Sequence, residues 1–135
     1  MKLDIDNCAA VTLFNERGSV LIVMRNPDTD SWMPGKWSVP GGHLHEGEDE
    51  RVGAVRELYE ETNLSVPADS LQLVERRGRI AFYMADQFSG RVILDETENV
   101  GYAWISPDII DTIDGVPDLV RTITLACRRR GGENV

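Results

Sequence analysis

Three glutamates near the middle of the chain have the spacing of a carboxylate cluster. Glu57, Glu60 and Glu61 stand at i, i+3 and i+4, so a helix places all three on one face. Two carboxylates about 5 Å apart repel by roughly 3 kcal/mol at an effective dielectric near 20, and a divalent cation relieves that repulsion. An all-oxygen cluster suits a hard ion such as Mg²⁺ or Mn²⁺, which also binds phosphate oxygens. From these three residues alone, a solvated acidic helix face is the alternative.

The residues around the glutamates favour the metal site. Segment 42–64 resembles the Nudix box, Gly-x5-Glu-x7-Arg-Glu-U-x-Glu-Glu-x-Gly-U, where U is a bulky apolar residue. A chance match in one chain has a probability on the order of one in a million. Asn63 stands in place of the second glycine, and asparagine is expected there as a left-handed helix C-cap. The matching positions are Gly42, Glu48, Arg56, Glu57, Leu58, Glu60, Glu61 and Leu64.

This resemblance implies a chemistry. Nudix enzymes hydrolyse a nucleoside diphosphate linked to another group, and divalent ions bridge the diphosphate oxygens and acidify the attacking water. By the resemblance, Glu60 and Glu61 are metal ligands, and Glu57 is a ligand or the base that orients the water. The backbone carbonyl of Gly41 is a further expected ligand, because a glycine lets the backbone approach the ion.

Two further residues complete the predicted catalytic set. Arg56 is expected to hold a neighbouring carboxylate such as Glu48 with its guanidinium fork. Members of the family place another acidic residue in a loop before the last strands, which points to Glu98, with Glu96 as the alternative. Glu98 and Glu96 are each a candidate for a metal ligand or general base, and the competing interpretation is that they are ordinary solvated loop acids.

Substrate contacts are predicted at three positions. Arg25 ends a strand near the box and is a candidate to meet a phosphate, against a surface ion pair as the alternative. Trp32 and Phe82 are candidates to stack on the base, although such residues are more often part of a core.

The composition limits the function classes. The 135 residues suffice for one domain, 1–135, and 41% of them are hydrophobic. The net charge of −9 argues against extended nucleic acid as a ligand, since a phosphate backbone needs a basic surface. Cys8 and Cys127 lack metal-ligand spacing and indicate free thiols in a reducing cytoplasm. No apolar run is long enough to span a membrane. A homodimer is expected from the resemblance alone.

The order of elements predicts the fold class. Strands, a helix, more strands and final helices indicate an α/β (α+β) protein with a mixed sheet covered on both faces, in agreement with the Nudix α/β/α sandwich. The box helix is predicted over 50–62, capped by Asp49, with Val52, Val55, Leu58 and Tyr59 towards the core. The remaining predicted elements are a hairpin of 8–14 and 19–25, a strand 37–39 ended by a glycine turn, an antiparallel pair at 71–75 and 79–85, a short strand 92–94, a strand 100–105, a short helix opened by Ser106 and Pro107, and a helix 117–129.

The resulting prediction is a Mg²⁺-dependent Nudix pyrophosphohydrolase, with Mn²⁺ as a possible substitute. The favoured substrate is a nucleoside triphosphate, split to monophosphate and pyrophosphate. The alternatives are a nucleotide sugar or dinucleotide polyphosphate as substrate, and a non-catalytic nucleotide-binding sensor on the same fold.

Overall fold

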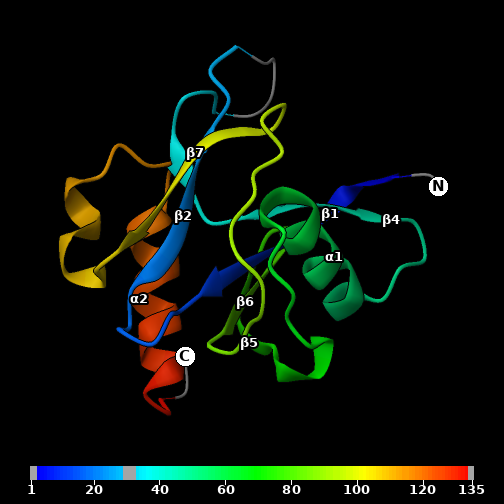
Figure 1. Cartoon of the computed structure of the whole chain (residues 1–135). Helices are drawn as coiled ribbons and strands as arrows, with labels where there is room; N and C mark the ends of the chain where they lie inside the picture. Colours follow the sequence, from blue (N-terminus) through cyan, green and yellow to red (C-terminus); the bar gives the residue numbers. More distant parts are fainter. Residues whose placement is uncertain (1–2, 29–32, 134–135) are drawn as a thin grey trace.

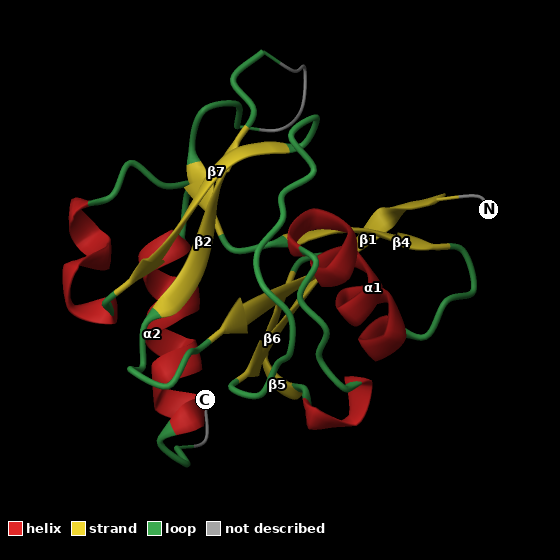
Figure 2. Ribbon diagram, in the orientation of Figure 1, coloured by secondary structure: helices red, strands yellow, loops and turns green. Residues whose placement is uncertain are grey.

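The computed structural model describes residues 3–28 and 33–133. Within them the chain forms β-strands, two α-helices and two 3₁₀ helices (Figures 1 and 2). Their bounds are β1 (Leu3–Leu13), β2 (Val20–Arg25), β3 (Trp37–Ser38), β4 (Gly41–His45), α1 (Glu50–Thr62), η1 (Ala68–Ser70), β5 (Gln72–Arg77), β6 (Ile80–Ala85), β7 (Asn99–Ile105), η2 (Pro107–Thr112) and α2 (Leu119–Arg130).

Two sheets lie between the two α-helices. The larger sheet has the order β4-β1-β6-β5 and is mixed, because β1 runs parallel to β6 and antiparallel to β4. The smaller sheet has the order β3-β2-β7 and is antiparallel. One core cluster joins α1 to the larger sheet through Ala54 and Leu58, and a second joins α2 to both sheets through Leu119 and Ile123. The predicted α/β/α architecture with a mixed sheet is confirmed.

The predicted hairpin of 8–14 and 19–25 is wrong in its pairing. The turn forms, with the N–H of Asn15 donating to the carbonyl of Ser19, but the two strands enter different sheets after one bridge between Phe14 and Val20. Both strands are buried along much of their length, so an unpaired edge would leave buried backbone groups without hydrogen bonds, and each strand takes a neighbour on both edges. Strand β1 takes β4 and β6, and β2 takes β3 and β7.

Two shorter predictions also need correction. The predicted glycine turn at 40–42 leads directly into strand β4, where Gly41 pairs with Ala10. A Cβ on Gly41 would lie 2.6 Å from the carbonyl oxygen of Ala9, so this close pairing requires glycine. Residues 92–94 form no strand; instead the N–H of Ile93 donates to the carbonyl of Thr62 at the end of α1.

Helix α1 has the predicted limits and caps. The Asp49 side chain accepts a hydrogen bond from the N–H of Val52 at 3.1 Å, and Asn63 is left-handed with φ of 66°. The predicted core face is rotated, because Val52 and Tyr59 are each 52% exposed. The buried face instead includes Ala54, Leu58 and Glu61. This rotation turns carboxylates towards the protein interior.

Candidate active site

Glu61 is a carboxylate buried at the junction of α1 and the two sheets. It is only 6% exposed. Its Oε2 accepts long hydrogen bonds of 3.4 Å from the N–H of Gly41 and from Nδ2 of Asn99. Burial, together with the charge of Glu57, raises the pKa of Glu61 to about 8. Such a carboxylate has lost most of its water, and the hydrogen bonds that it accepts from Gly41 and Asn99 are long, so it is well suited to bind a cation.

Glu57 lies one helical turn before Glu61 and beside strand β4. Its side chain is 15% exposed, and burial raises its pKa, with the charges of Glu60 and Glu98 adding to the shift. The backbone of Gly42 approaches this carboxylate so closely that a Cβ there would lie 2.5 Å from Oε2 of Glu57. The glycine at the start of the box therefore makes room for the carboxylate rather than for a turn.

Arg56 organises the outer side of the cluster. Its Nε and one terminal nitrogen bind both oxygens of Glu48, at 2.8 and 3.0 Å, and it also donates to the carbonyl of His43. Its other terminal nitrogen contacts Glu57 at 3.1 Å and Glu60 at 3.0 Å. The predicted Arg56–Glu48 pair is thus present, and a single guanidinium ties α1 to the loop that precedes it.

This pair gives a pH-dependent stability. The hydrogen bond from Arg56 lowers the pKa of Glu48 to about 2, so the stabilisation is complete above the ordinary carboxyl pKa and is lost as the pH falls towards 2. Glu48→Gln is expected to cost about 2 kcal/mol near neutral pH. The difference from the parent protein should shrink below about pH 4, measured by thermal unfolding across the pH range. The exposed Glu16→Gln serves as control, and a difference that does not change with pH would contradict the assignment.

Glu98 lies on an anchored loop next to the buried carboxylates. Its carbonyl accepts a hydrogen bond from the N–H of Asn26 at 2.9 Å, and the Asn26 side chain also binds the loop carbonyls at 96 and 97. The negative charge of Glu98 contributes to the raised pKa of both Glu57 and Glu61, so its side chain shares their electrostatic environment. Glu98 itself is exposed.

Arg25 and Asn99 face the same carboxylate from the smaller sheet. They are cross-strand partners at the ends of β2 and β7. Burial and the charge of Glu57 raise the pKa of Glu61, and the positive charge of Arg25 offsets part of that rise, which indicates that this arginine lies near the carboxylate. Asn99 was not predicted from the sequence; its only signal there is a polar residue at the start of an apolar strand.

Phe82, one of the two predicted base-stacking residues, does not face the carboxylates. Phe82 is buried, and the guanidinium of Arg77 lies 4.2 Å from its ring centroid. Its neighbours Ala81 and Tyr83 pack on the α1 side, so alternation along β6 turns Phe82 to the opposite face. Trp32 lies outside the described residues. Base stacking by either residue stays a prediction.

The carboxylates partly fit the metal that the resemblance implies. Among residues 3–28 and 33–133, no three His, Cys, Asp or Glu side chains are already gathered at metal-binding distance. The Glu60 side chain is not gathered with the other two carboxylates, because it is 53% exposed and turned towards Arg56. Glu57 and Glu61 carry raised pKa values from burial and like charge, and a hard cation would favour their ionised forms. These two residues fit the ion best.

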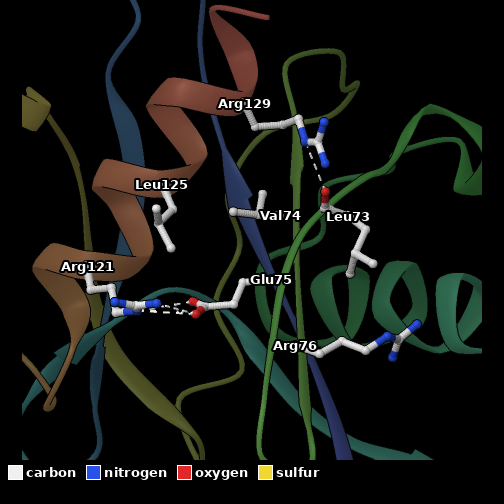
Figure 3. Close-up of a pocket in the computed structure, with 7 residues that line it drawn as sticks. All are labelled: Leu73, Val74, Glu75, Arg76, Arg121, Leu125 and Arg129. Atoms are coloured by element: carbon white, nitrogen blue, oxygen red, sulfur yellow. Dashed lines mark hydrogen bonds and ion pairs between the residues drawn. The ribbon is translucent and has the colours of Figure 1, made fainter. Parts of the chain in front are cut away.

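A separate hollow of about 500 Å³ lies between β5 and α2 (Figure 3). Arginine side chains dominate its rim, and they are held by partners: Arg121 binds Glu75 at 2.6 Å, and Arg129 donates to the carbonyl of Leu73 at 3.1 Å (Figure 3). On the other side of β5, Arg76 pairs with Glu50 at the start of α1. The hollow contains none of the clustered carboxylates, so it is distinct from the candidate site.

A family comparison decides what this arrangement belongs to. The model of the NUDIX domain matches residues 5–125, which include the whole carboxylate cluster and all but the first two residues of the two sheets. The chain belongs to the Nudix family. The sequence resemblance of segment 42–64 is thereby confirmed, and Nudix membership makes the chain a hydrolase acting on phosphoric anhydride bonds.

Curated relatives extend the similarity beyond the Nudix box. A "MutT-like protein" of Streptomyces ambofaciens is 30% identical over 118 residues, covering 76% of this chain and 73% of the relative. A "Putative 8-oxo-dGTP diphosphatase" of Bacillus subtilis is 30% identical over 103 residues, covering 73% and 65%. An "RNA pyrophosphohydrolase" of Bartonella quintana is 28% identical over 110 residues, covering 63% and 61%. The chain thus spans 61% to 73% of the length of these three relatives.

Solved structures show the same fold at low identity. A MutT protein from Methanosarcina mazei Go1 has a TM-score of 0.72 at 22% identity, covering 93% of this chain and 94% of that one. The NUDIX domain of Shewanella oneidensis NrtR, solved with ADP ribose, has a TM-score of 0.74 at 19% identity, covering 96% and 89%. These likenesses support the Nudix fold alone.

In the part of the chain that the structure describes, no helix has the length and hydropathy of a membrane span. Neither Cys8 nor Cys127 is in a disulfide.

Proposed function

We propose that this chain is a Mg²⁺-dependent pyrophosphohydrolase that splits a nucleoside triphosphate into the monophosphate and pyrophosphate. The observation that carries the proposal is the pair of like-charged carboxylates, half-buried Glu57 and buried Glu61, packed against the glycine backbone of β4. The relative named putative 8-oxo-dGTP diphosphatase supports a triphosphate as the substrate.

The residues divide the work of the proposed reaction. Glu57 and Glu61 would hold the ion, with Glu60 joining after release from Arg56. When bound, Mg²⁺ supplies charge neutralisation on the diphosphate and lowers the pKa of a coordinated water. Arg56 holds helix α1, which carries the proposed metal ligands, against the segment before it through Glu48 and the carbonyl of His43. Arg25, beside Glu61, is the proposed contact for a phosphate oxygen.

Other substrate classes remain as alternatives. Similar proteins include RNA pyrophosphohydrolases and an Ap4A hydrolase of C. elegans, and another was solved with ADP ribose. Nucleotide sugars and dinucleotide polyphosphates are therefore the second candidate class. A non-catalytic sensor is less favoured, because all the box carboxylates are retained. The homodimer, the preference for small nucleotides over extended nucleic acid and the cytoplasmic location stay predictions.

A nucleotide panel tests the proposal directly. Canonical and oxidised nucleoside triphosphates, a nucleotide sugar, a dinucleotide polyphosphate and a 5′-triphosphate RNA are incubated with Mg²⁺, and products are resolved by mass. Release of pyrophosphate from a triphosphate is expected, and ¹⁸O-water shows which phosphorus receives the water oxygen. Binding without cleavage of any substrate would favour the sensor, and cleavage restricted to another class would replace the substrate assignment.

Glu57→Gln tests the catalytic role of the cluster. Turnover is expected to fall at least about tenfold while the protein stays folded, because an amide neither ligates the ion well nor accepts a proton. Steady-state rates and circular dichroism measure the two effects. Glu75→Gln, which removes a glutamate held by Arg121 away from the site, is the control expected to keep full turnover. Near-normal turnover of the Glu57 variant would refute the assignment.

Glu98→Gln tests the loop acid. A metal ligand or general base at this position predicts a fall in turnover of about tenfold or more and a higher Mg²⁺ requirement. The measurement is the dependence of the rate on Mg²⁺ concentration, with Asp28→Asn as an exposed acidic control. An unchanged rate and metal dependence would remove Glu98 from the site.

A further inference from the structure

Asn99 carries a buried polar atom that has no partner in the described residues. The residue is 2% exposed, and its Oδ1 has no hydrogen bond. Its Nδ2 donates to Oε2 of Glu61 at 3.4 Å. Only the Nδ2 end of the amide can donate to a carboxylate, so Oδ1 necessarily points elsewhere. A buried carbonyl without a donor costs about 1–3 kcal/mol, so the asparagine at this position calls for a compensating role.

A β-bulge gives Asn99 its direction. Along β2 and β7 the pairs Leu21–Trp104 and Ile22–Ala103 alternate between the α1 side and the α2 side. The register then shifts by one residue, so that Arg25 pairs with Asn99 and Val100 is the extra residue.

Without this bulge, Asn99 would share the face of Ala103, away from α1. With it, Asn99 joins Arg25 on the side of Glu61, and both groups act on that carboxylate. Bulges commonly re-aim a side chain next to an active site.

The two donors to Glu61 reach the same oxygen. Both the N–H of Gly41 and Nδ2 of Asn99 bind Oε2, so Oε1 receives neither of these bonds. This arrangement holds the carboxylate from two elements, β4 and β7, and leaves its second oxygen to a ligand. Metal-binding carboxylates are usually oriented by such outer partners, and their loss weakens metal binding or activity about 10–100-fold.

We propose that Asn99 is a positioning residue of the metal site: Nδ2 fixes Glu61 for coordination, and Oδ1 accepts a hydrogen bond from a water on the ion. Mg²⁺ usually keeps several waters when it binds a protein, and these are strong donors. The inference rests on the proposed function for the identity of the site, but it concerns metal affinity rather than the choice of nucleotide.

Asn99→Leu separates positioning from a structural role. Leucine is close to asparagine in size. It removes the unpartnered acceptor, which favours folding, and the 3.4 Å hydrogen bond to Glu61, which opposes it, so the stability of the metal-free protein should change little. Binding of Mn²⁺ alone, followed by electron paramagnetic resonance, is expected to weaken about 10–100-fold. The Mg²⁺ concentration for half-maximal activity should rise by a similar factor.

A second variant and a control complete the experiment. Asn99→Ala cannot clash and should weaken Mn²⁺ binding in the same way, while Val100→Thr, at an exposed neighbour, should leave it unchanged. Unchanged Mn²⁺ affinity in both Asn99 variants would overturn the proposal. So would weakened binding accompanied by a large fall in the unfolding temperature of both metal-free variants, which would indicate a structural residue.

The same data separate this inference from the proposed function. A parent protein that binds Mn²⁺ but cleaves no nucleotide refutes the hydrolase while still testing Asn99. A parent protein that cleaves nucleotides, with unaltered metal binding in the Asn99 variants, refutes only the positioning role.

Discussion

Glu61→Gln is expected to lower turnover at least about a hundredfold and, at the same time, to make the metal-free protein more stable. The activity is lost because an amide replaces an ionised ligand at the centre of the site. The stability is gained because a neutral side chain removes the cost of a carboxylate that is 6% exposed and has only long hydrogen bonds. A gain of at least about 1 kcal/mol corresponds to roughly 4 °C for a chain of this size.

The sign of the pH dependence sharpens this prediction. The pKa of Glu61 is raised to about 8, above its unfolded value, so the metal-free protein loses stability as the pH rises from the ordinary carboxyl range through 8. The advantage of the glutamine variant should therefore be largest above about pH 8 and smallest near pH 5. Thermal unfolding with a chelator present measures it. A variant that is less stable than the parent at every pH would show that the Glu61 carboxylate is well satisfied without a metal.

Gly42→Ala is expected to reduce turnover about a hundredfold with little change in stability. The new Cβ would lie 2.5 Å from Oε2 of Glu57 and 2.7 Å from its Cδ. These atoms belong to the far end of a flexible side chain, so the carboxylate can move away at low cost to folding. A displacement of about 1 Å in a catalytic group is enough for a hundredfold loss.

Gly101→Ala is the matched control for this change. Gly101 also lies in a strand, but its added Cβ would meet only Met24, at 3.9 Å, which is ordinary van der Waals contact. Rates and unfolding temperatures of both variants are compared with the parent. Full activity of the Gly42 variant would mean that the position of Glu57 is not critical. A large fall in its unfolding temperature would mean that the new Cβ displaces the backbone of β4 and not the Glu57 carboxylate.

The fold was predictable where local signals are strong. Helix α1 begins and ends as predicted because Asp49 supplies a side-chain cap and Asn63 adopts the left-handed conformation. The mixed architecture followed from the order of elements. The partners of β1 did not, because a strand buried on both faces carries no mark of which neighbours it takes, and a short turn after it favours the hairpin that the structure lacks.

The site was predictable to the extent that it lies in one helix. The spacing of Glu57, Glu60 and Glu61 placed them together, but it did not show that Glu61 is buried and Glu60 exposed. That difference depends on how α1 rotates against β4, which in turn depends on Gly53: a Cβ there would lie 2.5 Å from Leu44. Asn99 lies 38 residues after Glu61 in the sequence, and a bulge in β7 turns it towards that carboxylate. No local pattern in the sequence predicts this bulge.

The position of β1 has a consequence for how the chain acquires its structure. Strand β1 is synthesised before the other described strands and ends up in the interior of the larger sheet, hydrogen-bonded to β4 and to the much later β6. Its parallel neighbour is therefore absent until residues 80–85 have been synthesised, and β2 waits longer still for β7. Pairings of such long sequence separation slow folding and leave apolar strand edges open during synthesis. We expect the nascent chain to depend on chaperones until its last strand has left the ribosome.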